Sequence, residues 1–217
     1  MEKDEIPALP LPQKGSRMFV EPRDWTDNAW LGRTRIVNAW SLYAEGFKRA
    51  ADQLVEDLLD GSAHSPDLLI YPILFLYRHY LELRLKELII ASARLLGETP
   101  NVPGHHTLTD LWAEVRPRLE RIWPGPSARR HHDAIREHLR EFCNLDPKSQ
   151  AFRYPVDTNG VPSVTTDANI SLRHLKETIA GISTILDGSS FGMNEMADFN
   201  TEMQGELENE TTEFCEP

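Results

Sequence analysis

The stretch YRHYLELRLKEL, residues 77–88, decides the fold. Its leucines and tyrosines give it the apolar content of a core helix, while Arg78, Glu82 and Lys86 follow one another at intervals of four residues. This spacing places opposite charges one turn apart on one helical face. His79 lies three residues before Glu82 and shares their side of the helix. The stretch predicts a buried helix with a polar cluster, which serves either as structural ion pairs or as the lining of a site.

Apolar residues at helical spacing recur on both sides of this stretch, bounded by Pro, Gly and capping residues. The predicted helices cover about 34–60, 65–96, 107–122, 127–144 and 170–186. Pro117 is expected to bend or break the third helix, and Gly188 is expected to end the last one. Between the last two helices, Asn159-Gly160 is typical of a hairpin turn. The sequence predicts an all-α, up-and-down bundle of four or five helices with a short irregular or hairpin insertion before the last helix.

The two ends of the chain differ in composition from its middle. Residues 1–33 contain the Pro-rich stretch IPALPLPQKG, which favours an extended arm. The bundle is assigned to residues 34–188. Residues 189–217 hold eight acidic and no basic residues, within a formal net charge of -11 for the whole chain. This composition predicts an acidic, flexible tail.

Several classes of protein are disfavoured by the sequence. The longest apolar run, 68–77, is far shorter than the roughly 20 residues of a membrane-spanning helix. The N-terminus is acidic where a signal peptide is basic, and two cysteines do not form a disulfide framework. No HExxH or CxxC motif is present. We expect a cytoplasmic protein with no membrane partner, no metal and no cofactor.

An arginine-rich segment lies between residues 116 and 140, where seven arginines accompany three acidic residues. Arg129, His132, Arg136 and Arg140 are three or four residues apart and are expected to form one basic face. Such a face is either a solvated helix surface or a binding site for RNA phosphates. In the second case, the acidic tail is expected to cover it within the same chain.

The order of three stretches resembles the HEPN superfamily: YRHYLELRLKELI, then HHTLTDLW, then FRYPVD before a final amphipathic helix. The resemblance covers roughly residues 66–187. It implies a four-helix bundle that forms a homodimer and, in many members, cleaves RNA without metal. The implied catalytic motif is an Arg followed by four to six residues and a His.

No histidine of this chain follows an arginine at that spacing. The resemblance therefore implies a non-catalytic or degenerate module, dimeric and associated with RNA, bacterial defence or a toxin–antitoxin pair. One alternative is a metal-independent ribonuclease with a rearranged site formed by Arg78, His79 and Arg153. Another is a structural subunit that binds only a protein partner.

Three further residues are predicted to support a polar site around Arg78 and His79. They are Glu82, His106 and Tyr154. Arg153 itself either belongs to this site or pairs with a nearby carboxylate, such as Asp146 or Asp157.

Overall fold

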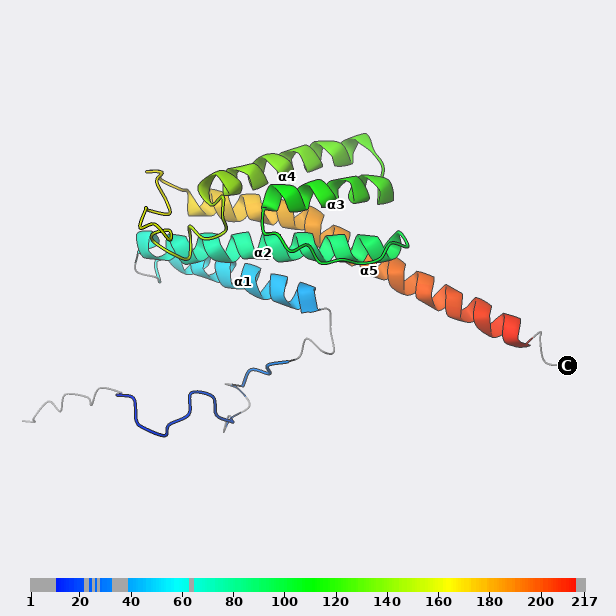
Figure 1. Cartoon of the computed structure of the whole chain (residues 1–217), viewed down its shortest axis with the longest axis horizontal. Helices are drawn as coiled ribbons and strands as arrows, with labels where there is room; N and C mark the ends of the chain where they lie inside the picture. The colour runs from blue at the N-terminus through cyan, green and yellow to red at the C-terminus, as the bar shows by residue number, and fades with distance from the viewer. Residues whose placement is uncertain are drawn as a thin grey trace, which may run out of the picture.

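The structure, a computed structural model, describes residues 11–21, 24, 26, 28–32, 39–62 and 65–213, with residues 206–213 described by their backbone alone. Five helices form an all-α bundle (Figure 1). They are α1 (Ala39–Leu59), α2 (Pro66–Leu95), α3 (Leu108–Ile122), α4 (Pro126–Leu145) and α5 (Leu172–Glu213). The described residues contain no strand, and the segment between α4 and α5 is irregular. The predicted fold class is confirmed.

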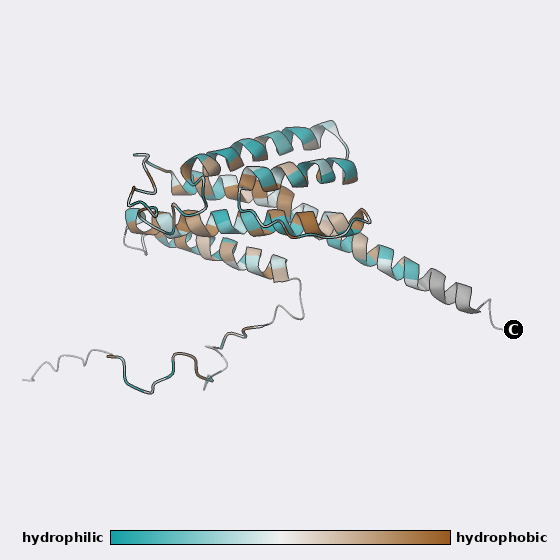
Figure 2. Cartoon of the chain, viewed as in Figure 1, coloured by the Kyte–Doolittle hydropathy of each residue, from teal (hydrophilic) through white to brown (hydrophobic). Residues whose placement is uncertain are grey.

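Helix α2 is the centre of the bundle and packs against α1, α3 and α5. Buried residues occur on every side of α2 from Tyr77 to Ala93. A helix that is covered on all sides needs apolar residues around its whole circumference, which the leucines and isoleucines of 81–90 provide. By contrast, α4 is amphipathic and carries hydrophilic residues along its outer side (Figure 2).

The ends of α2 follow from local sequence. Ser65 has extended backbone before the helix, and Pro66 occupies the first turn, where its missing N–H costs nothing. At the other end, Gly97 has a φ of 70°, a conformation that favours glycine. In α3 the helix continues through Pro117 to Ile122, so this proline does not break it.

The insertion before α5 contains one tight turn. Val156 and Pro162 form an isolated antiparallel bridge, and Gly160 between them has a φ of 77°. The Asp157 carboxylate accepts the backbone N–H groups of Asn159 at 2.8 Å and Val161 at 3.0 Å. The hairpin-type turn predicted at Asn159-Gly160 is confirmed.

The prediction that the last helix ends at Gly188 is wrong, because α5 continues to Glu213. Ser190 and Met193 remain buried beyond this glycine, so packing of α5 in the bundle extends past it. Gly188 has no positive φ and is an ordinary helical residue here. Beyond the bundle α5 projects as a single helix (Figure 1). The described tail is therefore directed away from α4 and does not cover its arginines.

The described residues of the arm, within 11–32, are exposed and lie outside the five helices. The predicted start of the first helix at 34–38 and Cys215 of the tail lie outside the described residues. Within the described part of the chain, no helix has both the length and the apolarity to cross a membrane.

Candidate functional site

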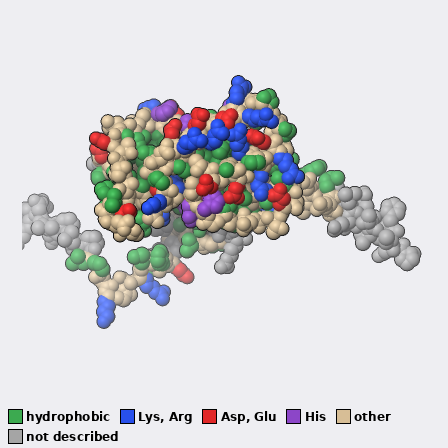
Figure 3. Space-filling model, turned by 45° about the horizontal axis from the view of Figure 1, so that its top comes forward, with side chains coloured by type: hydrophobic (Ala, Val, Ile, Leu, Met, Phe, Trp, Pro, Cys, Tyr) green, Lys and Arg blue, Asp and Glu red, His purple; other side chains and the backbone are tan. Residues whose placement is uncertain are grey.

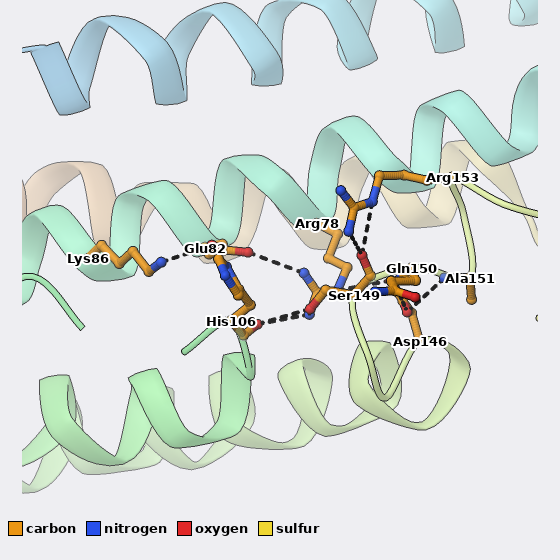
Figure 4. A network of polar contacts seen from close by, with 9 residues as sticks. All are labelled: Arg78, Glu82, Lys86, His106, Asp146, Ser149, Gln150, Ala151 and Arg153. Atoms are coloured by element: carbon orange, nitrogen blue, oxygen red, sulfur yellow. Dashed lines mark hydrogen bonds and ion pairs between the residues drawn. The ribbon is translucent and has the colours of Figure 1, made fainter. Parts of the chain in front are cut away.

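Arg78 is the centre of a buried polar network between α2 and two loops (Figure 4). Its Nη2 donates to the carbonyl oxygen of His106 at 2.9 Å and to the hydroxyl of Ser149. Its Nε lies 3.3 Å from Asp146 Oδ2, and its Nη1 lies 3.4 Å from Glu82 Oε2. The planar guanidinium thus ties the loop before α3 and the loop after α4 to the central helix.

Glu82 continues this network by one helical turn. Its Oε1 lies 2.6 Å from His106 Nδ1 and forms an ion pair with Lys86 Nζ at 3.1 Å. Burial raises the pKa of the Glu82 carboxyl, but the hydrogen bonds from His106 and Lys86 outweigh burial and hold this pKa below its ordinary value. Glu82 is therefore an anion at neutral pH that orients the His106 ring, whose side chain is 61% exposed.

The loop after α4 is folded by Asp146. Its Oδ1 accepts the backbone N–H groups of Gln150 at 2.7 Å and Ala151 at 2.9 Å. Ser149, directly before Gln150, has a φ of 61°, in the left-handed region that residues other than glycine rarely adopt. Strained residues of this kind persist where several contacts fix the loop, and they concentrate at functional sites.

Arg153 leaves this loop and lies over aromatic rings. Its guanidinium carbon is 6.0 Å from the centroid of Phe75 and 5.8 Å from that of Tyr154. Its Nε donates to the Ser149 carbonyl oxygen at 3.1 Å. This side chain is exposed and held by backbone and ring contacts.

The carboxylate partners considered for Arg153 are used elsewhere. Asp146 pairs with Arg78, and Asp157 accepts backbone N–H groups of its own turn. Among the described residues, Arg153 forms no ion pair with either carboxylate and donates instead to the Ser149 carbonyl oxygen, so the pairing alternative is wrong.

His79 is half-buried between two phenylalanine rings. Phe47 meets it edge-on at 4.4 Å between centroids, and Phe75 is stacked on it at 5.7 Å. Burial lowers the pKa of His79, and the nearby Glu82 charge only partly offsets this effect. His79 is therefore neutral at physiological pH and able to accept a proton.

These side chains surround one pocket of about 410 Å³. The pocket is lined by Phe75, Arg78, His79, Glu82, His106, Lys148, Ser149, Gln150 and Arg153. Five residues singled out from the sequence are thus brought together, while Tyr154 contacts Arg153 from outside the lining. Sequence reasoning missed Phe75 and 148–150. The turn-forming residues Asp146 and Pro147 at the end of a helix were the available signal for this loop.

A second buried network lies farther along α2. Arg84 Nε is 2.8 Å from Asp187 Oδ1, and its Nη1 contacts Glu87. Ser190 donates to Glu87 at 2.9 Å, and Tyr80 donates to Asp187 at 2.9 Å. Arg84 Nη1 also donates to Ser41 of α1 at 3.2 Å, so this network joins three helices. It borders none of the described pockets.

The predicted basic face on α4 is correct for its arginines and wrong for its histidine. Arg129, Arg136 and Arg140 are exposed. His132 is buried, with its ring 5.6 Å from that of Trp112 and its Nδ1 3.6 Å from Glu120. The reason is helical geometry, since His132 lies one turn before Ile135 and two turns before Leu139 on the core side of α4.

The surface of α3 and α4 is basic but not uniformly so. Figure 3 shows Lys and Arg side chains gathered there with Asp and Glu among them. Arg116 pairs with Glu120 at 2.7 Å and Asp133 at 2.7 Å, and Arg136 pairs with Asp133 at 3.1 Å. Part of the positive charge on this face is therefore neutralised locally.

Comparisons of the chain with protein-family models, curated proteins and solved structures gave no match. Among the described residues, no three His, Cys, Asp or Glu side chains are placed to hold a metal ion.

Proposed function

We propose that this chain is a divergent HEPN-like helical bundle that binds RNA at the pocket beside His79 without cleaving it. One observation carries the proposal: the buried network of Arg78, Glu82 and Asp146 presents exposed Lys148 and Arg153 around a pocket of about 410 Å³. In this arrangement Arg78 positions the loops, and the exposed cations contact the ligand.

The chemistry of the pocket suits a phosphodiester. Three cations line it, Arg78, Lys148 and Arg153, against the single carboxylate of Glu82. Guanidinium and ammonium groups bind phosphate oxygens through charge-assisted hydrogen bonds. The Phe75 and Tyr154 rings next to Arg153 add surfaces on which a base can stack. The resemblance to HEPN proteins favours RNA as the source of this phosphate, and the defence or toxin–antitoxin setting stays a prediction.

The test compares RNA retention by wild type and by Lys148→Ala/Arg153→Ala in a gel-shift assay with chelator present. Loss of two phosphate contacts is expected to weaken binding about tenfold or more and to reduce the salt dependence. Arg49→Ala/Arg94→Ala removes the same charge from exposed positions outside the pocket and should bind like wild type. A separate variant, Arg129→Ala/Arg136→Ala/Arg140→Ala, tests whether the exposed arginines of α4 also contribute to RNA binding. Equal binding by the pocket variant and the wild type would contradict the proposal.

A second candidate, a metal-independent ribonuclease, is favoured by one further observation. His79 and His106 line the same pocket as Arg153, and Glu82 orients His106. Neutral His79 would take the 2′-hydroxyl proton while the 2′-oxygen attacks phosphorus. Protonated His106 would then give a proton to the departing 5′-oxygen, leaving a 2′,3′-cyclic phosphate. Arg153 would stabilise the negative charge that develops on the phosphate.

Cleavage separates the two candidates. If the chain is a ribonuclease, chelator-treated wild type shortens RNA, and His79→Ala and His106→Ala each abolish the cyclic-phosphate product while RNA is still retained. If it is a binding module, RNA remains intact with all three proteins. If RNA is neither cleaved nor retained, the hypothesis that remains is a subunit that binds only a protein partner.

A further inference from the structure

A hollow of about 270 Å³ lies between α4 and α5. It is found where α4 ends and α5 begins, which is the same end of the bundle (Figure 1). Helices α2, α4 and α5 and the segment directly before α5 all contribute to its lining. It shares no lining residue with the pocket beside His79. The hollow is therefore a separate candidate site.

The inner surface of this hollow is apolar. Buried core side chains from three helices form its floor: Leu74, Phe142, Ile179 and Ile182. Leu145 and Leu175, which are partly buried and packed against the core, extend the apolar wall. Water in contact with such a surface finds few hydrogen-bond partners there. An apolar group that displaces this water therefore binds favourably.

The volume of the hollow limits the size of its occupant. One water takes about 30 Å³ of liquid, so the hollow has room for on the order of nine waters. The same space holds about ten heavy atoms, which is the size of octanoate or of a substituted benzoate. Drug-sized ligands occupy sites of about 300–1,000 Å³, so a smaller molecule suits this one.

Polar side chains line the exposed rim. His138 of α4 and His174 of α5 bring imidazole nitrogens to the rim from both helices, and Ser171 and Thr178 add hydroxyl groups. Each imidazole can donate an N–H to an anion. The lining contains one carboxylate, Glu141, which is 76% exposed and lies 4.0 Å from His138 Nδ1. Water screens the charge of so exposed a group, so it opposes an anion at the rim only weakly.

The charges at the start of α5 also favour an anion at this rim. The first turn of α5 contains no acidic residue, although Arg173 and His174 both lie in it. Positive charge at the N-terminal end of a helix is unfavourable, because the helix dipole is positive there. A negative group beside His174 offsets this repulsion.

We propose that the hollow between α4 and α5 binds a small apolar carboxylate. The hydrocarbon part lies on Leu74, Phe142 and Ile182, where it replaces water over the core. The carboxylate lies at the rim and accepts N–H groups from His138 and His174. The proposal does not rest on RNA binding.

Isothermal titration calorimetry with octanoate and the full chain tests the site. Wild type is expected to bind one octanoate with a Kd below about 1 mM. Thr178→Trp places a large side chain on the partly exposed rim and should weaken binding at least tenfold. Thr184→Trp is the matched control, because it makes the same change at an exposed position of α5 outside this lining. It should bind octanoate like wild type, and circular dichroism should show that both variants remain helical.

The charge of the head group is tested with octyltrimethylammonium, which has the same hydrocarbon chain and a cationic head. It should bind wild type at least tenfold more weakly than octanoate does. His138→Ala/His174→Ala should weaken octanoate binding, whereas His105→Ala, at a histidine outside the hollow, should not.

Two results would overturn the site: no saturable octanoate binding by wild type, or equal binding by Thr178→Trp. Equal binding of the cationic probe, or unchanged binding by His138→Ala/His174→Ala, would overturn the assignment of the carboxylate to the two histidines. Each of these measurements is made without RNA, so its outcome is independent of the gel-shift assay.

Discussion

Arg78 and Arg84 lie six residues apart on the same helix and are both almost fully buried, at 4% and 3% exposure. Each pairs with a glutamate on α2. They differ in what supplies their other partners. Loops supply those of Arg78, beside a pocket, whereas helices α1 and α5 supply those of Arg84. A buried arginine therefore does not by itself mark a site, and the elements that surround it decide which role it has.

The Arg84 network is expected to give the largest loss of stability when broken. Arg84→Met leaves Glu87 buried without its guanidinium partner, which costs about 3–5 kcal/mol. Adding Glu87→Leu should recover much of this loss, because it removes the buried charge that lost its guanidinium partner. Urea unfolding measures both. Arg49→Met, at a 79% exposed arginine, should cost less than about 1 kcal/mol. A cost of Arg84→Met as small as that of Arg49→Met would show that water reaches this network.

Breaking the Arg78 network should lower the free energy of unfolding less than breaking the Arg84 network does, but it should weaken RNA binding more. Arg78→Met removes charged hydrogen bonds to the two loops, worth about 1.5–3 kcal/mol, and water entering the pocket can solvate Glu82 and Asp146. The loop with Lys148 should loosen, so RNA retention should fall in the gel-shift assay. Arg84→Met, assayed without denaturant, should retain RNA normally. The proposed difference between the two arginines would be wrong if Arg78→Met and Arg84→Met lowered the free energy of unfolding equally and both still retained RNA.

The sequence was sufficient to predict where the helices lie, because the patterns that indicate a helix and its ends are local. Apolar periodicity and flanking Pro and Gly placed α2 within a residue of its observed ends. Those signals failed at Gly188, since a glycine ends a helix only when the backbone turns there, and in α5 the backbone stays helical while Ser190 and Met193 beyond it are buried. Long-range packing outweighs a local stop signal.

The site was predictable only in part, for a similar reason. Arg78, His79 and Glu82 share one helix, so their spacing predicted a polar cluster. Lys148 and Ser149 join it only because Asp146 folds a loop far along the chain, in which Ser149 lies 71 positions after Arg78. His132 was misplaced because its polar side chain was counted with the arginines, although its position one turn before Ile135 puts it in the core.

The pH dependence of the unfolding free energy should also distinguish the surroundings of Arg78 from those of Arg84. This effect is expected to be smaller than that of removing either arginine. Burial lowers the pKa of His79 from its ordinary 6.5, so the folded chain binds fewer protons than the unfolded chain below that pH. His79 thus contributes to a fall in stability as pH drops below about 6.5. His132, whose pKa burial also lowers, acts in the same direction. His79→Phe keeps the ring between Phe47 and Phe75.

Unfolding free energies at pH 7.5 and 5.5 test this dependence, and His79→Phe should make the difference between them smaller. The Arg84 network contains no histidine among its described contacts, so Arg84→Met should lower stability at both pH values without changing that difference. An unchanged pH difference in His79→Phe would assign the dependence to His132.

The smallest expected effect comes from two serines, one in each network. Ser149 has a φ of 61° and accepts from Arg78. Ser149→Ala loses the hydroxyl and keeps the strained Cβ, so it should be less stable than Ser149→Gly by about 1 kcal/mol. Ser190 donates to Glu87 from within α5, where glycine is the poorer helix residue, so Ser190→Ala should be more stable than Ser190→Gly by about 1 kcal/mol. Urea unfolding of the four variants should therefore give opposite signs at the two positions. Equal signs would mean that the Ser149 loop relaxes out of the left-handed conformation in solution, and the pocket would lose the strained support on which its shape depends.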